Sequence, residues 1–95
     1  MRVIWGRNAR RDLNEAISYL LEESVQAAEL VGNRIRNAVN RLQKSPRIGR
    51  PGRVKGTREL VVLRTPYIVV YRIRSKRVEV MGVIHAARRW PSRFE

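Results

Sequence analysis

The chain has 95 residues, 43% of them hydrophobic, a length that predicts one folded domain over residues 1–95. It has no cysteine, which excludes disulfides and thiolate metal sites, and no apolar run long enough to predict a membrane span or a signal peptide, so we expect a cytoplasmic protein. Lys and Arg outnumber Asp and Glu by 21 to 8, giving a formal net charge of +13.

The first half of the chain predicts a short strand and two helices. Residues 2–5 read as the strand, and Asn8 is placed to cap a helix over about residues 9–23. Ser24 is placed to cap a second helix, which ends before Pro46 because the residue before a proline is pushed out of the helical region. The apolar stripes recur at three-to-four spacing: Ala9, Leu13, Ala16, Ile17, Leu20 and Leu21, then Ala28, Val31, Ile35, Ala38, Val39 and Leu42. A very short turn between them predicts an antiparallel helix pair.

The second half predicts a loop and three strands. Residues 46–57 lose all periodicity and are rich in glycine, proline and basic side chains, which predicts a loop and no regular element. Strands are expected at residues 59–63, 67–74 and 77–85. Their short connections favour an antiparallel meander. The fold class is therefore α+β.

Alternation assigns the strand side chains to the two faces of the sheet. In residues 67–74, Tyr67, Val69, Tyr71 and Ile73 share one face. In the last strand one face carries Val78, Val80, Gly82 and Ile84, and the other carries Glu79, Met81, Val83 and His85. We expect the helices to cover one face of the sheet and the other face to be partly open and basic.

The positive charge is concentrated in the second half. Residues 46–95 carry thirteen Lys or Arg against three Asp or Glu, whereas residues 1–45 carry eight against five. Such an excess attracts nucleic acid, an anionic membrane surface or an acidic protein partner. The plainer alternative is a solvated surface that keeps the protein soluble.

Most catalytic classes find no support. The glycines of residues 49–56 lack the strand and helix that would flank a phosphate-binding loop. One histidine with two strand glutamates makes no convincing metal site, and Asp12, the only aspartate, offers no triad. The sequence therefore predicts neither a metal nor a cofactor.

One metal-free reaction fits a basic site, namely RNA cleavage by its own 2′-hydroxyl. His85 would transfer protons, because imidazole titrates near neutrality, and Arg58, Arg72, Arg88 and Arg89 would neutralise the phosphate. Alternatively, the histidine is structural, bonded to backbone at a strand end, and the arginines dock an acidic protein. A plain nucleic-acid-binding module would need base-stacking aromatics on the open face, whereas Tyr67 and Tyr71 fall on the apolar one.

A succession of motifs resembles the RelE/ParE superfamily, the toxins of bacterial type II toxin–antitoxin modules. After the helix pair these motifs are Ser45-Pro46-Arg47-Ile48-Gly49-Arg50, Gly56-Thr57-Arg58-Glu59-Leu60-Val61, Pro66-Tyr67-Ile68-Val69-Val70-Tyr71-Arg72 and Val78-x-Val80-x-x-Val83-Ile84-His85-x-x-Arg88. The resemblance covers nearly the whole chain. It implies two helices packed on a small antiparallel sheet.

The two best-known branches of the superfamily have different activities, and the resemblance also leaves another target open. RelE-like members are ribosome-dependent mRNA endonucleases, and ParE-like members poison DNA gyrase. Ile68 stands where the nuclease branch typically has an arginine, and Ala86 stands where related nucleases have a tyrosine. The Ser-Pro-Arg-Ile-Gly-Arg segment and the His-x-x-Arg ending look more like the ParE branch. A gyrase-directed toxin that is not an enzyme is therefore our first expectation, with an mRNA interferase using His85, Arg58 and Arg72 as the alternative.

The partners implied by the resemblance are an acidic cognate antitoxin, in a toxin–antitoxin hetero-oligomer, and either gyrase or the ribosome with its mRNA. We expect the antitoxin to fold along the groove between the helix pair and the sheet. Residues 88–95 should be needed for growth inhibition and not for the fold, unless Trp90 fills the core. The side chains expected to bind the target or the antitoxin are Arg50, Arg53, Lys55, Arg64, Arg88, Arg89 and Trp90.

Overall fold

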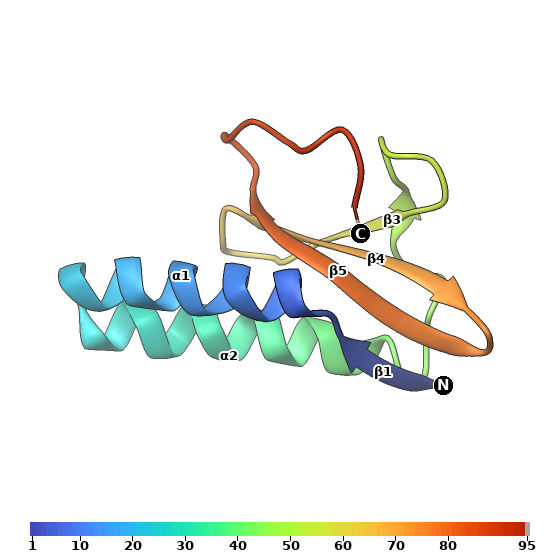
Figure 1. Ribbon diagram of the computed structural model, residues 1–95. Helices are drawn as coiled ribbons and strands as arrows, with labels where there is room; N and C mark the ends of the chain where they lie inside the picture. Colours follow the sequence, from blue (N-terminus) through green and yellow to red (C-terminus); the bar gives the residue numbers. More distant parts are fainter. Residues whose placement is uncertain (95) are drawn as a thin grey trace.

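A computed structural model describes residues 1–94. Two helices lie side by side beneath a twisted five-stranded sheet whose strand order is β1-β5-β4-β3-β2 (Figure 1). The elements are β1 (Arg2–Trp5), α1 (Arg7–Glu23), α2 (Val25–Arg41), β2 (Arg50–Pro51), β3 (Arg58–Val61), β4 (Tyr67–Arg74) and β5 (Arg77–His85). The α+β class predicted from the sequence is confirmed.

The helix pair forms as predicted, with one difference at its start. Helix α1 is capped by Gly6, and the prediction that Asn8 caps it is wrong, because Asn8 lies in the first turn and its side chain accepts a hydrogen bond from Arg11. The predicted cap at Ser24 is confirmed, since its hydroxyl oxygen accepts from the backbone N–H of Ala27 at 3.1 Å. Ser24 alone separates the two helices and turns the chain back.

The predicted meander is present as β3, β4 and β5, and two further strands extend it. Strand β1 pairs with β5 in parallel, which places the first residues of the chain at one edge of the sheet. Residues 46–57 were expected to form no regular element, and this is wrong for β2, which pairs with Arg58 and Glu59 of β3. The helices cover one face of the sheet, as expected (Figure 1).

A β-bulge in the pairing of β4 with β5 reverses the face to which the later side chains of β5 point. Val70 lies opposite Gly82 and Tyr71 lies opposite Val80, so Met81 is an extra residue in β5. Val78 and Val80 pack in the helix-side core as expected, but beyond the bulge it is Val83 that does so. The predicted placement of Gly82 with Val78, and of Met81 with Val83, is therefore wrong.

The second face of the sheet is less open than expected. Ile68 and Val70 point to this face and are buried, and so is Met81. The C-terminal segment, residues 86–94, arches over the sheet on the side away from the helices (Figure 1). A Cβ atom placed on Gly82 would lie 2.8 Å from Cε1 of Phe94, so the end of this segment rests on β5.

No helix within residues 1–94 is long and apolar enough to cross a membrane. Glu95, the last residue of the predicted domain, lies outside the described residues.

Candidate functional site

His85 ends β5, where the register places it opposite Tyr67 of β4. The two rings meet edge to face, with centroids 5.5 Å apart and planes at 81°. Its Nδ1 atom accepts a hydrogen bond from the backbone N–H of Ala87 at 3.1 Å, and its carbonyl accepts from Arg88. The imidazole therefore shapes the first turn of the C-terminal segment.

Arg58 lies opposite Tyr71 and holds the stretch of chain that precedes β2. Its guanidinium donates to the carbonyl oxygens of Gly49, at 2.8 Å, and Arg47, at 3.4 Å. These two hydrogen bonds to backbone carbonyls fix the guanidinium in place. Arg58 therefore already has a structural role.

Arg72 is held by an acidic partner on the neighbouring strand. Its Nε lies 2.6 Å from a carboxylate oxygen of Glu79, which also pairs with Arg77 at 3.1 Å. The hydrogen bond from Arg72 holds the pKa of Glu79 below its ordinary value, although partial burial opposes this. The single carboxylate of Glu79 thus partly offsets the charges of both Arg72 and Arg77.

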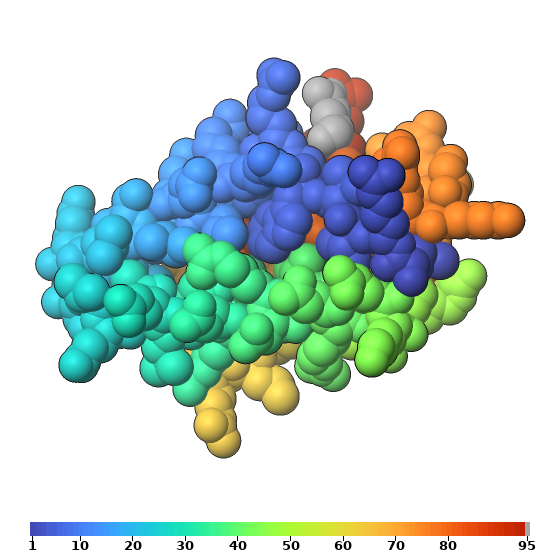
Figure 2. Space-filling view, turned by 90° about the horizontal axis from the view of Figure 1, so that it is seen from below, coloured from blue at the N-terminus to red at the C-terminus, as the bar shows by residue number. Residues whose placement is uncertain are grey.

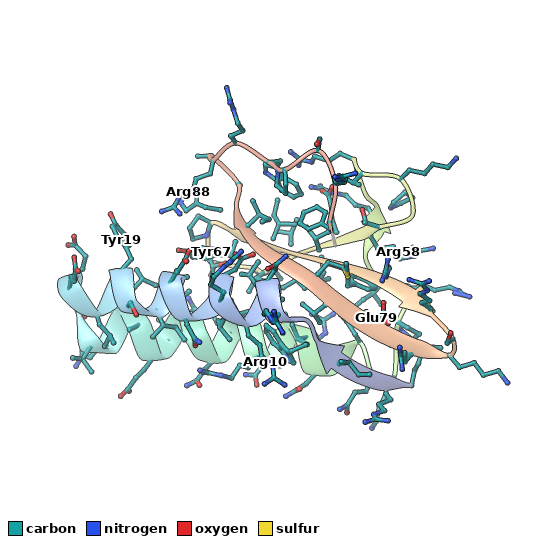
Figure 3. The ribbon with its side chains drawn as sticks, viewed as in Figure 1. Arg10, Tyr19, Arg58, Tyr67, Glu79 and Arg88 are labelled. Atoms are coloured by element: carbon teal, nitrogen blue, oxygen red, sulfur yellow. The ribbon has the colours of Figure 1, made fainter. Side chains whose placement is uncertain are left out.

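These three residues, predicted as a catalytic set, do not converge. His85 is opposite Tyr67 and Arg58 is opposite Tyr71, and four residues along a strand span about 13 Å. Arg72 follows Tyr71 directly along β4. Its side chain therefore projects from the sheet face opposite to the one that carries Tyr71. Figure 3 shows Tyr67 at one end of the sheet and Arg58 at the other.

The basic loop, residues 50–57, is anchored on Glu59, a buried carboxylate that sequence reasoning missed. Glu59 is only 3% exposed and pairs with Arg50 at 3.0 Å and with Arg53 at 3.2 Å. Its Oε2 also accepts from the backbone N–H of Arg53 at 2.8 Å. Burial acts to raise the pKa of Glu59, but the hydrogen bonds from Arg53 and Arg50 outweigh it and lower the pKa. Two of the predicted binding arginines therefore also hold the loop on the sheet, and Lys55 stands exposed near its tip.

The stretch before this loop is fixed by Tyr71, whose hydroxyl lies in the helix-side core. That hydroxyl donates to the carbonyl of Pro46 at 2.7 Å and accepts from the N–H of Gly49 at 2.9 Å. A Cβ atom on Gly49 would lie 2.6 Å from the same oxygen, so the position requires glycine. Burial raises the pKa of the Tyr71 phenol. Tyr67 is buried as well, which confirms that neither tyrosine offers a base-stacking surface.

Two of the predicted tail residues contribute exposed charge, and one contributes packing. Arg88 and Arg89 are exposed, and Figure 3 shows Arg88 at the Tyr67 end of the sheet. Trp90 is half-buried, and the guanidinium carbon of Arg53 lies 3.5 Å from its ring centroid. The tail is thereby joined to the basic loop, and Trp90 lies outside the helix-side core.

Arg64 is separate from this cluster. It lies in the turn between β3 and β4 with a φ of 63°, and its carbonyl accepts from Arg34 of α2 at 3.2 Å. The predicted binding residues therefore form two surfaces, one at the loop and tail and one at the edge of β3.

A small cavity of about 120 Å³ lies at the His85 end of the sheet. Beside His85 it is lined by Arg88 and Arg89 and by two carboxylates of α1, Asp12 and Glu15. Burial raises the pKa of Asp12, although the hydrogen bond that its carboxylate accepts from Val83, at 3.0 Å, acts in the opposite direction. In the described part of the chain, no three His, Cys, Asp or Glu side chains are grouped so as to hold a metal ion.

Comparison with known proteins agrees with this fold. The family model described as "ParE toxin of type II toxin-antitoxin system, parDE" matches residues 3–90. Y4kP from Sinorhizobium fredii, which is named as a toxin, is 46% identical over 90 residues, covering 95% of this chain and 93% of that protein. Toxin RelE2 from Caulobacter vibrioides is 32% identical over 87 residues, covering 92% and 97%.

A solved structure has the same architecture. A chain of the chromosomal ParDE system from P. aeruginosa superposes with a TM-score of 0.82 at 26% identity, covering 90% of this chain and 95% of that one. The resemblance predicted from the sequence is thereby confirmed. The chain belongs to the ParE toxin family of the RelE/ParE superfamily and is the toxin of a ParDE type II toxin–antitoxin system.

Proposed function

We propose that this toxin inhibits growth by a ParE-type action on DNA gyrase, and that binding of its antitoxin prevents that action. The observation that carries the proposal is the separation of His85, Arg58 and Arg72. Cleavage of RNA needs an acid, a base and cations around one phosphate. Here the two arginines are held by Gly49 and Glu79 at other points of the sheet.

A docking surface needs no such convergence. Binding to a large protein is carried by a few well-placed side chains, with arginine and tryptophan prominent among them. Arg88 and Arg89 are exposed, and Trp90, which follows them, contacts the guanidinium of Arg53. Arg53 is in turn held by its ion pair with the buried Glu59. Together these residues form a basic surface. We take this tail surface, Arg88 to Trp90 with Arg53, as the gyrase-binding surface.

The alternative is a RelE-like, ribosome-dependent mRNA endonuclease with His85 as acid or base. It is favoured by the relative named Toxin RelE2 and by the small cavity that brings His85 together with Arg88 and Arg89. In that case the ribosome and its mRNA would have to supply the cationic groups around the phosphate, because Arg58 and Arg72 do not lie beside His85.

Expression of variants in cells separates the two activities. Under gyrase binding, Arg88→Ala and Arg89→Ala should each weaken growth inhibition partially and His85→Ala should be tolerated. Induced DNA repair and filamentation should precede any loss of translation. Rapid translation arrest with cuts in mRNA, abolished by His85→Ala alone, would overturn the proposal, because loss of one acid–base group typically costs about 10²–10⁴ in rate.

The partner in this proposal is an acidic antitoxin that forms a hetero-oligomer with the toxin. The thirteen basic residues among residues 46–95 favour a segment rich in Asp and Glu. Apolar side chains are also exposed on the helix pair, among them Tyr19, Val25 and Leu30. We expect a segment that is disordered alone to fold along the groove between the helix pair and the sheet, and a continuation of it along the helices would cover these apolar side chains.

A further inference from the structure

The exposed face at the start of α1 carries a cluster of positive charge, the arginine patch of Arg7, Arg10 and Arg11. All three side chains are exposed, and their spacing of three and four residues places them on one face of the helix. Arg11 donates to the side-chain oxygen of Asn8 at 3.2 Å, and within residues 1–94 neither Arg7 nor Arg10 forms an ion pair. Like charges at this spacing repel one another, so the cluster is unfavourable unless an anion binds to it.

The arginine patch lines a shallow hollow of about 850 Å³. Asn14 and Ser18 continue the lining along α1 with uncharged hydrogen-bonding side chains, and the carboxylates of Glu15 and Glu22 lie further along the helix. The end of the hollow that attracts anions is therefore the start of α1. Figure 2 shows this start of the helix, in blue, on the side of the molecule opposite the yellow segment around residues 60–65.

The arginine patch adjoins the C-terminal segment. Arg11 also lines a cavity of about 370 Å³ together with Pro91 and Phe94 of that segment. Arg88 and Arg89, at the beginning of the same segment, line the small cavity whose other wall is α1. A large partner held at the tail surface therefore lies beside the arginine patch.

The side chains around the patch favour the phosphate backbone of duplex DNA. Phosphate oxygens are commonly contacted by Arg, Asn and Ser side chains, and the hollow presents all three kinds. A protein partner would need an apolar centre, but the exposed large apolar side chains of α1, Tyr19 and Leu21, lie near its other end. A single strand would need an exposed aromatic ring for its bases, whereas Trp5, which also lines the hollow, packs against the core.

We propose that Arg7, Arg10 and Arg11 bind the phosphate backbone of duplex DNA, in the segment on which gyrase acts, while the tail surface contacts the enzyme. Each guanidinium neutralises a phosphate and releases a condensed counterion. The patch reads no base, so binding is independent of the DNA sequence. The inference deepens the proposed action on gyrase and rests on it for its role in the cell.

The test measures the binding of a short fluorescent DNA duplex to the purified toxin over a range of salt concentrations, with no gyrase present. The triple variant carries Arg7→Gln, Arg10→Gln and Arg11→Gln. Its affinity at low salt should fall by about tenfold or more, because three phosphate contacts are lost. The slope of log affinity against log salt concentration should become shallower by about 0.9 for each arginine removed.

The matched control carries Arg34→Gln, Arg41→Gln and Arg64→Gln. These three arginines line a cavity of about 240 Å³ beside β3, so the control removes the same charge from a different surface. It should bind the duplex within about threefold of the unaltered toxin, since it keeps the phosphate contacts. An equal loss of affinity in the two triple variants would show an effect of net charge alone and would overturn the inference. Tighter binding of single-stranded RNA than of the duplex would also overturn it.

NMR spectra of the unaltered toxin locate the binding surface without any substitution. When the duplex is added, the backbone amide signals of residues 7–14 should shift. Shifts confined to the basic loop and the tail surface would contradict the inference. Because neither measurement contains gyrase, a wrong gyrase assignment would leave the DNA-binding patch standing, and failure to bind DNA would leave gyrase inhibition to be decided by its own assay.

Discussion

The guanidinium carbon of Arg53 lies over the indole of Trp90, 3.5 Å from the ring centroid. Arg53 is itself held by Glu59, both through its side chain at 3.2 Å and through its backbone N–H at 2.8 Å. The contact links the basic loop, the buried carboxylate of β3 and the C-terminal segment into one unit. The placement of the tail surface therefore depends on residues more than 30 positions earlier in the chain.

Replacing Trp90 should loosen the tail without unfolding the domain. Trp90→Ala loses the stacking on Arg53 and a half-buried ring, which together stabilise the fold by about 1–2 kcal/mol. Each 1 kcal/mol lowers the melting temperature of a domain this size by roughly 4–8 °C. Thermal melting followed by circular dichroism measures this, and Arg88→Ala, which removes an exposed side chain, is the control.

Removing residues 88–95 extends the same prediction, although Glu95 lies outside the described residues. None of residues 88–94 belongs to the helix-side core, so the truncated chain should keep its helices and strands. Growth inhibition should be lost. A truncated chain without a cooperative melting transition would mean that the tail belongs to the core.

Tyr71→Phe should destabilise the fold, even though it removes one oxygen atom. The change leaves the N–H of Gly49 and the carbonyl of Pro46 without the partner they share in a buried region. Leaving such groups unsatisfied costs about 1–3 kcal/mol. Urea unfolding measures the loss. Tyr67→Phe is the matched control, because it keeps the edge-to-face ring contact with His85 and should cost less.

Glu59 should make stability depend on pH in the acidic range. Its folded-state pKa lies below the ordinary value of 4.5, so the stabilisation is fully present above pH 4.5 and is lost as pH falls through the folded-state pKa. Glu59→Gln should lower stability by about 1–3 kcal/mol at pH 7, because hydrogen bonds to a charged acceptor are lost.

The measurement for Glu59 is the difference in unfolding free energy between the two proteins at several pH values. This difference should shrink as the solution is acidified below pH 4.5. Other carboxylates, including Glu79, titrate in both proteins and cancel in the comparison. A difference that stays constant from pH 7 to pH 3 would contradict the Glu59 anchor.

The sequence predicts this fold well wherever local pattern determines structure. Apolar spacing specifies both helices, the Ser24 hydroxyl specifies the turn between them, and short connections specify the meander. The bulge at Met81 has no local signal, because β-strand alternation reads the same whether or not an extra residue is inserted. The pairing of β1 with β5 joins residues about 75 positions apart and depends on tertiary packing alone.

The candidate site was predicted less completely, because the ion pairs that hold its arginines also depend on tertiary packing. Composition identifies Arg50, Arg53 and Arg72 as basic but not which carboxylates offset them. The one available signal was Glu59, a lone acidic residue inside an apolar strand directly after a basic loop. A buried carboxylate needs a charged or hydrogen-bonding partner, so its nearest arginines were the natural candidates.

Supercoiling of relaxed plasmid by purified DNA gyrase, with the purified toxin added, tests the central claim most directly. The account predicts that the toxin inhibits supercoiling and that Arg88→Ala and Arg89→Ala each weaken this inhibition by a graded amount. His85→Ala should inhibit as strongly as the unaltered toxin. Gyrase that keeps full activity in a tenfold molar excess of toxin, while the same preparation cuts mRNA on ribosomes and His85→Ala does not, would contradict it.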